Sequence, residues 1–241
     1  MNGSRHFDRR PFAFAVACVA LTSVGFLASA PQPARLPDPT VSQGATAEWV
    51  DLFNRKNLDG WKVFPSPADA AANPWTVHDD VLSCAGQPIG YIETEKSYES
   101  FELELEWRFD PKKGAGNSGV LLRVVGEDQV WPKSMEAQLH SENAGDIWNI
   151  GDFTATVDAS RTQGRRTVKN YDTNEKPLGG WNHYRIVFDG PTLMLFVNGT
   201  LQNVATHCEA VPGRLALQSE GAHIQFRNIR LRELPKAARP Q

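Results

Sequence analysis

Three residues suited to acid–base chemistry and hydroxyl binding alternate with apolar residues in one short run. Glu136, Gln138 and His140 occupy every second position of the segment 135–140. Successive side chains of a β-strand point to opposite faces, so on a strand these three groups share one face, about 7 Å apart. The carboxylate or the imidazole can then take a proton while the amide holds a hydroxyl. Any solvent-facing strand also carries polar residues at this spacing, which is the simpler alternative.

A second polar run precedes the first and is predicted to lie beside it. Asn117 begins the segment 117–123 and Arg123 ends it, on the same side of the strand by alternation. Sequential strands usually pair, so Arg123 is expected to reach Glu136, hold it ionised and lower its pKa. A structural salt bridge is the alternative. Gln218 lies in a third run with the same alternation.

Tryptophans flank these polar runs. Trp131, Trp148 and Trp181 stand in the adjoining predicted loops. A carbohydrate site combines planar groups that bond adjacent hydroxyls with an aromatic surface for the C–H faces of sugar rings. The combination predicts carbohydrate binding, with Trp148 and Trp181 contacting the sugar. For each tryptophan by itself, packing in the core or in a loop is the alternative.

The elements that must position these residues are predicted to be β-strands. Apolar residues recur with a period of two, most cleanly from Phe101 to Phe109. Asn198-Gly199 is a strong hairpin turn between two such runs. Many short strands joined by turns within one span of about 185 residues indicate a single all-β domain, an antiparallel β-sandwich or barrel. Further strands are predicted at 119–125, 135–140, 184–189, 193–197, 213–219 and 223–231.

One long segment departs from this pattern. Residues 141–180 are rich in Gly, Asn, Asp and Thr, so most of the segment is expected at the surface, where long loops tend to be functional. Its basic residues form either a solvated hairpin or a ligand-binding patch: Arg161, Arg165, Arg166 and Lys169.

The N-terminal residues are predicted to direct export. Basic residues precede an uncharged apolar stretch that contains the small triplet Ala28-Ser29-Ala30, so residues 1–30 are expected to be a signal peptide. A Pro-rich linker (31–47), one domain (48–234) and a short tail (235–241) follow. The mature protein is then periplasmic or extracellular, and lipidation at Cys18 is the weaker alternative. In an oxidising compartment, Cys84 and Cys208 form either a disulfide or two buried free thiols.

Composition and motifs exclude several classes of protein. A formal net charge of −3 gives no clustered excess of Lys and Arg for nucleic acid. Beyond the signal, no apolar stretch approaches the ~20 residues of a membrane span. The sequence has no Gly-x-Ser-x-Gly elbow, phosphate-binding glycine loop or His-Glu-x-x-His helix. The sequence does not decide whether the protein binds a divalent metal or partner proteins.

A series of motifs, in order along the chain, resembles one known family. They are Leu58-Asp59-Gly60-Trp61, Asn117-Ser118-Gly119, Glu136-Ala137-Gln138-Leu139, Gly145-Asp146-Ile147-Trp148, Leu217-Gln218-Ser219-Glu220-Gly221 and Phe226-Arg227-Asn228-Ile229. The sequence is similar to the 3-keto-disaccharide hydrolase domain family over about residues 48–234. The resemblance implies a concanavalin-like jelly-roll sandwich, exported by bacteria, that acts on glycosides oxidised at C3.

The implied chemistry fits a polar sheet face. A ketone at C3 acidifies the C2 proton, so a base can remove it, the enolate can expel the aglycone from C1, and water can add to the enone. We expect Glu136 or His140 as the base and Arg123 as the enolate stabiliser. Asn117, Gln138 and Gln218 are expected to position hydroxyls. The alternatives are a non-catalytic carbohydrate-binding module and a partner-binding domain without sugar chemistry.

Overall fold

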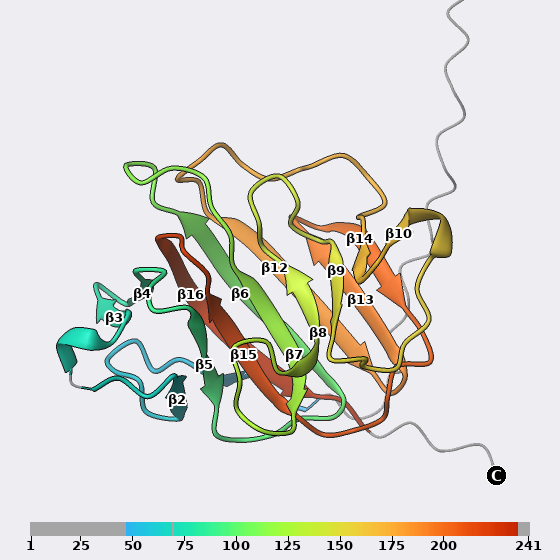
Figure 1. Ribbon diagram of the computed structural model, residues 1–241, viewed down its shortest axis with the longest axis horizontal. Helices are drawn as coiled ribbons and strands as arrows, with labels where there is room; N and C mark the ends of the chain where they lie inside the picture. Colours follow the sequence, from blue (N-terminus) through green and yellow to red (C-terminus); the bar gives the residue numbers. More distant parts are fainter. Residues whose placement is uncertain (1–46, 69, 236–241) are drawn as a thin grey trace, which may run out of the picture. The chain divides into compact units, whose positions relative to one another are not determined.

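The computed structural model describes residues 47–68 and 70–235 (Figure 1). The predicted signal peptide, nearly all of the predicted linker and most of the predicted tail lie outside the described residues. In the part that is described, no helix is long and apolar enough to cross a membrane.

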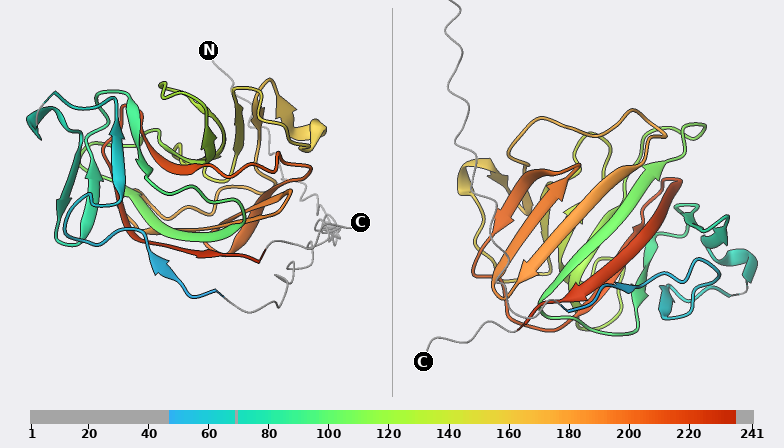
Figure 2. Two further views of the ribbon diagram at one scale, coloured as in Figure 1. Left: turned by 90° about the horizontal axis from the view of Figure 1, so that it is seen from below. Right: turned by 180° about the vertical axis from the view of Figure 1, so that it is seen from behind.

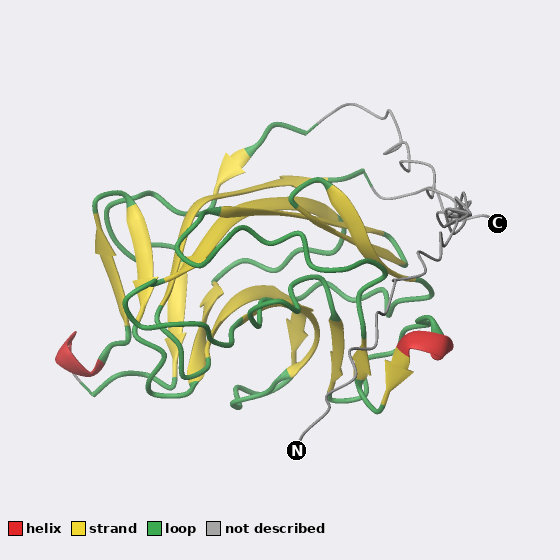
Figure 3. Cartoon of the chain, turned by 90° about the horizontal axis from the view of Figure 1, so that it is seen from above, coloured by secondary structure: helices red, strands yellow, loops and turns green. Residues whose placement is uncertain are grey.

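The described strands form two antiparallel sheets, visible as two layers in Figure 3. Sheet A has the order β14 (Thr200–Ala205), β13 (Thr192–Val197), β12 (Asn182–Asp189), β6 (Phe101–Phe109), β16 (Ile224–Glu233), β4 (Val81–Cys84), β3 (Trp75–His78), and β1 (Val50–Asp51) pairs with β16. Sheet B has the order β10 (Thr162–Gln163), β11 (Arg166–Thr167), β9 (Ile147–Ile150), β8 (Lys133–Gln138), β7 (Gly119–Val125), β15 (Arg214–Ser219), β5 (Gly90–Thr94), β2 (Trp61–Phe64). Two short 3-10 turns complete the described secondary structure, Ala70–Ala72 and Ala159–Arg161.

The main core lies between the two sheets and follows from the alternation in the sequence. In β6, the apolar residues from Phe101 to Phe109 face inward, and glutamates and an arginine face outward. Sheet B contributes the inward residues of its central strands, among them Val120, Met135 and Leu217. Burying two such faces is what drives a sandwich to form. The predicted all-β antiparallel sandwich is confirmed.

A second, smaller apolar cluster lies on the outer face of sheet B, the face turned away from sheet A. It contains Tyr91, Leu121, Val124, Ile150 and Ala216, all at most 4% exposed. An outer sheet face is normally solvated. This one is partly covered by the segment that links β7 to β8, which arches out from sheet B in Figure 2 (left).

The predicted turns and the long segment take regular structure. Asn198 and Gly199 both have positive φ, 46° and 82°, which is the type I′ geometry that joins β13 to β14. The segment 141–180 contains β9, β10 and β11, which extend sheet B at one edge. Cys84 and Cys208 are buried free thiols, which decides between the two alternatives left by the sequence.

Candidate functional site

Glu136 lies in the middle of β8 on the outer face of sheet B. Its neighbours across the sheet are Leu121 of β7 and Trp148 of β9. Glu136 is only 5% exposed, and its Oε1 atom has no hydrogen-bond partner among the described residues. Burial raises the pKa of Glu136 to about 8, because a charge in an apolar setting loses its hydration. Glu136 is therefore a buried acid–base group whose carboxyl holds its proton up to about pH 8.

Gly119 of β7 provides the space into which the Glu136 carboxyl points. A Cβ atom at Gly119 would lie 2.3 Å from Oε1 of Glu136 and 2.3 Å from Oε1 of Gln218, which comes from β15. Oε1 of Gln218 is also buried, and no described residue gives it a hydrogen bond. Buried oxygens normally have donors. The Gln218 side chain also makes a polar contact with the Glu136 carboxyl that acts to lower its pKa, while the two Oε1 atoms have no donor among the described residues.

Glu220 supplies a second carboxyl group directly after β15. Burial raises its pKa, and the charge of His140 and polar contacts with Trp131 and Asn117 oppose that shift. The charge of Glu220 in turn raises the pKa of Glu136. The two acids are therefore electrostatically linked, and Asn117 contacts Glu220. Glu220 belongs to the motif Leu217–Gly221 and follows Gln218 at the same alternation, which is the signal in the sequence that could have identified it.

Trp148 and Arg165 complete the surroundings of Glu136. Trp148 is the cross-strand neighbour of Glu136, and its Nε1 donor is buried with no acceptor in the described part of the chain. The guanidinium carbon of Arg165 lies 5.9 Å from the centre of the Trp148 ring. Its charge acts to lower the pKa of Glu136, against the larger effect of burial. Trp148 lies on strand β9 and not in a loop as predicted, although it does neighbour Glu136. The cation nearest to this pair, Arg165, comes from the long segment 141–180.

Arg123 is not that cation, which corrects the prediction. The β7 strand has a bulge after Leu122, where its register with β8 shifts, and Arg123 adopts a positive φ of 53°. The extra residue reverses the alternation, so the Arg123 side chain turns inward. Its guanidinium stacks 3.5 Å from the Phe188 ring centre and donates to the backbone carbonyls of Glu99, Gly190 and Glu209.

Arg123 is fully buried and holds three chain segments together at the far end of β7. It neither contacts Glu136 nor lowers its pKa, and the pKa of Glu136 is raised. The expectation that Arg123 stabilises an enolate at Glu136 is therefore not supported by its placement.

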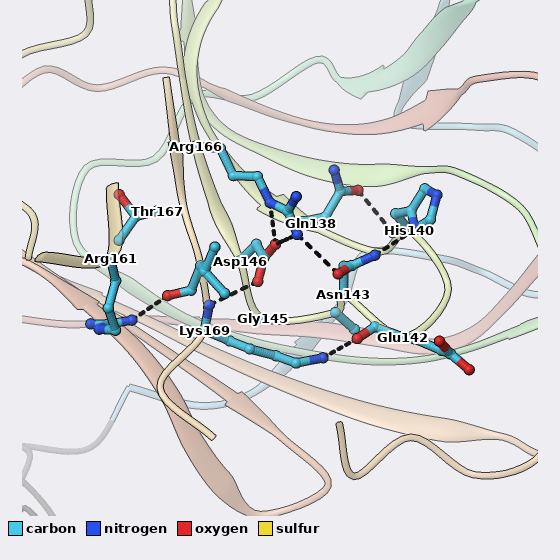
Figure 4. Close-up of polar contacts among 12 residues, drawn as sticks. Gln138, His140, Glu142, Asn143, Gly145, Asp146, Arg161, Arg166, Thr167 and Lys169 are labelled. Atoms are coloured by element: carbon cyan, nitrogen blue, oxygen red, sulfur yellow. Dashed lines mark hydrogen bonds and ion pairs between the residues drawn. The ribbon is translucent and has the colours of Figure 1, made fainter. Parts of the chain in front are cut away.

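Gln138 and His140 belong to a hydrogen-bond network at one end of the face (Figure 4). Gln138 accepts with Oε1 from the backbone N–H groups of the next two residues, at 2.9 and 2.8 Å. Nδ2 of Asn143 lies 2.8 Å from Nδ1 of His140, while Oδ1 of Asn143 accepts from Arg166 at 2.9 Å. Arg166 in turn pairs with the buried Asp146. Gln138 therefore secures the turn that carries His140, and His140 is an exposed residue at the rim.

A cleft of about 560 Å³ opens beyond His140, away from Glu136. Its wall includes His140, Glu142, Glu175, Lys176 and Leu178. Glu136 does not line this cleft. His140 therefore lines this cleft, whereas the polar atoms of the Glu136 face are buried.

Trp181 lies on the other side of the molecule from Glu136, which corrects a further prediction. Its ring is sandwiched between the guanidinium groups of Arg108 and Arg227, at 4.4 and 4.1 Å, on the outer face of sheet A. The sequence placed Trp181 in a loop but could not tell which sheet that loop would join. Trp181 does not share a site with Glu136.

Among residues 47–68 and 70–235, no group of three or more His, Cys, Asp or Glu side chains is arranged to hold a metal ion.

Comparisons with known proteins identify a family for this chain. Residues 48–232 match the family model described as a 3-keto-alpha-glucoside-1,2-lyase-like domain. No curated protein sequence matches the chain.

Solved structures show the fold. A proposed glycosyl hydrolase from Parabacteroides distasonis ATCC 8503 is 24% identical with a TM-score of 0.58, over 78% of this chain and 100% of its own. The carbohydrate-binding module CBM66 from Bacillus subtilis is 14% identical with a TM-score of 0.53, over 73% and 98%. The β-glucanase of Bacillus licheniformis is 10% identical with a TM-score of 0.53, over 80% and 100%. The predicted jelly-roll sandwich is confirmed. An enzyme and a binding module share it, so the fold alone does not assign an activity.

Proposed function

The chain belongs to the 3-keto-alpha-glucoside-1,2-lyase-like family, and on that premise we propose that it cleaves glycosides whose sugar carries a ketone at C3. The reaction is elimination of the aglycone followed by hydration. The family and the fold support a glycosyl-hydrolase-like domain.

The observation that carries the proposal is the buried, partly unpartnered carboxyl of Glu136 with a pKa of about 8. A base of that pKa is about half ionised near pH 8, and it is a stronger base than an ordinary glutamate. The C2 proton is made acidic by the adjacent ketone, so a single carboxylate can remove it. A binding module needs no such group, since amides and aromatic rings suffice to hold a sugar.

The neighbouring side chains supply the other requirements of the reaction. Glu136 takes the C2 proton, and the negative charge moves to the C3 oxygen, where the cation of Arg165 and the free N–H of Trp148 stabilise it. The C1–oxygen bond then breaks, and the leaving oxygen takes a proton from Glu220, whose pKa burial raises. Gln218 holds hydroxyls beside Glu136. Water adds to the resulting enone, its hydroxyl at C1 and its proton at C2.

The proposal is tested by giving the purified domain a 3-keto-glucoside and the unoxidised parent glucoside, with and without a chelator. We expect release of the aglycone from the keto compound alone. The Glu136→Gln variant should lose about 10²–10⁴-fold of this activity, which is the contribution of a positioned base. Glu95→Gln, a substitution of an exposed glutamate, is the matched control and should leave the rate unchanged.

Binding of the parent glycoside without turnover of either compound would overturn the proposal in favour of a carbohydrate-binding module. A His140→Ala variant separates the two base candidates. Because Nδ1 of His140 is already in contact with Asn143 and the ring is exposed, we expect this variant to keep activity within about 10-fold of wild type.

Export is part of the same proposal, since it rests on the predicted signal in residues 1–30. Expression of the full chain with cell fractionation tests it. Appearance of a shortened chain in the periplasm or medium is the expected result, and a full-length cytoplasmic chain would contradict it.

A further inference from the structure

The segment between β7 and β8 carries a feature that the proposed reaction does not yet use. Four large hydrophobic side chains of the described residues are exposed, and Trp131 is the aromatic one, 54% exposed. It is followed by the buried Pro132, which directly precedes β8. An isolated exposed Trp next to buried polar groups is an arrangement typical of sugar and aryl binding.

The segment is fastened across the outer face of sheet B. Oδ2 of Asp128 pairs with Nζ of Lys62 at 2.7 Å, and its Oδ1 atom accepts from Arg214 at 3.3 Å. The hydroxyl of Tyr91 lies 3.5 Å from the same Oδ1 atom. Lys62, Tyr91 and Arg214 come from three different strands, β2, β5 and β15. Asp128 therefore ties the arching segment of Figure 2 to the sheet on the side away from β8.

The anchored segment brings Trp131 to the second carboxyl of the site. The Trp131 side chain makes a polar contact with Glu220, which opposes the rise in the pKa of that acid. Its indole nitrogen is thereby directed toward Glu220, while more than half of its surface stays open to solvent. The ring is held at one edge, and its apolar area is free for a ligand.

We infer that Trp131 is the aglycone-binding residue of the site and that Asp128 positions it. The inference rests on the proposed function, in which Glu220 protonates the oxygen that leaves C1. Whatever group is attached to that oxygen must lie next to Glu220, and Trp131 is the exposed aromatic ring there. An indole face accommodates the C–H face of a second sugar or an aryl ring and gains little from a methyl group. The site therefore selects glycosides with a cyclic aglycone.

The test compares three 3-keto-glucosides that carry a methyl, a 4-nitrophenyl or a second glucosyl group. Trp131→Ala should lower kcat/KM for the two cyclic aglycones by about 10-fold, mainly through KM, and change the methyl compound by less than about 2-fold. Trp131→Phe should recover most of the loss. Val50→Ala, which shortens another exposed hydrophobic residue on sheet A, is the matched control and should change none of them.

Asp128→Asn should show the same selectivity with a smaller loss of about 3-fold, because the segment loses the charge that fastens it. A binding measurement separates recognition from chemistry. In the Glu136→Gln background, added Trp131→Ala should weaken binding of the 4-nitrophenyl compound and leave binding of the methyl compound unchanged.

An equal loss of kcat for all three substrates would overturn the inference, because Trp131 would then act only through the protonation of Glu220. Unchanged kinetics for all three substrates would overturn it as well. Failure of the proposed function is distinguishable from both results, because wild-type protein would then turn over none of the three keto compounds.

Discussion

Glu102 and Glu136 are buried to nearly the same degree on the outer faces of two different sheets, yet their partners differ. Glu102 is 2% exposed and Glu136 is 5% exposed. Glu102 accepts from Nε of Arg185 at 2.5 Å and from Nε of Arg232 at 2.6 Å. Oε1 of Glu136 has no donor within the described residues.

The difference arises from the strands on either side. On sheet A, arginines of β12 and β16 lie next to the glutamates of β6, so each outward carboxylate meets a cation. On sheet B, the cross-strand neighbours of Glu136 are leucine and tryptophan. A buried charge without a partner costs stability, and proteins retain such groups mainly where chemistry needs them. Sheet A uses its carboxylates to hold strands together, and sheet B has one without such a partner, the carboxyl that we propose acts on a substrate.

The largest expected effect concerns the buried charge with the most partners. Arg123→Met should destabilise the domain by about 4 kcal/mol, because three backbone carbonyls lose their donor in a dry region. Urea unfolding measures the change. The folded fraction should keep its kcat, and a loss of kcat with unchanged stability would return Arg123 to the catalytic site.

The paired glutamate should respond next most strongly. Glu102→Gln leaves two partly buried arginines without their counter-charge, so we expect a loss of about 3 kcal/mol in the free energy of unfolding. Glu136→Gln, the same substitution on sheet B, should be neutral or stabilising at pH 8. Equal losses in the two variants would contradict the contrast between the sheets.

The pH dependence of stability should distinguish the two faces. The pKa of Glu136 is about 8 in the folded domain and near its ordinary value of 4.5 in the unfolded chain. Folding therefore favours the protonated acid, and this contribution is fully present below pH 4.5 and lost as pH rises through about 8. The free energy of unfolding of the wild type, minus that of Glu136→Gln, should therefore fall by about 1.4 kcal/mol per pH unit as pH rises between these values. A flat difference curve in denaturant unfolding would show that Glu136 titrates normally.

The smallest expected effect tests the space beside Glu136. Gly119→Ala places a methyl group against the ends of the Glu136 and Gln218 side chains, which are flexible and can move aside. We expect kcat/KM for a 3-keto-glucoside to fall about 10-fold, or about 1.4 kcal/mol, with little change in melting temperature. Gly199→Ala, in the β13–β14 turn on sheet A where an added Cβ meets nothing within 4 Å, is the control and should leave kcat/KM unchanged.

The sequence by itself determined the β-sandwich and two residues of the site, Glu136 and Gln218. Alternation is a local property, since period two follows from the geometry of a single strand. It was therefore sufficient to place Glu136 and Gln218 on an outer face and to identify β6 and the Asn198-Gly199 turn. The motif order also pointed to the family.

Only the tertiary structure decided which of these residues meet. One bulge reverses the alternation in β7 and turns Arg123 into the core, and no local pattern marks that extra residue. Trp181 lies on the other sheet, whereas Glu220, Arg165 and Trp131 converge on the site from separate segments. Strand pairing and loop packing depend on contacts distant in sequence. The burial that raises the pKa of Glu136 exists only once those contacts have formed.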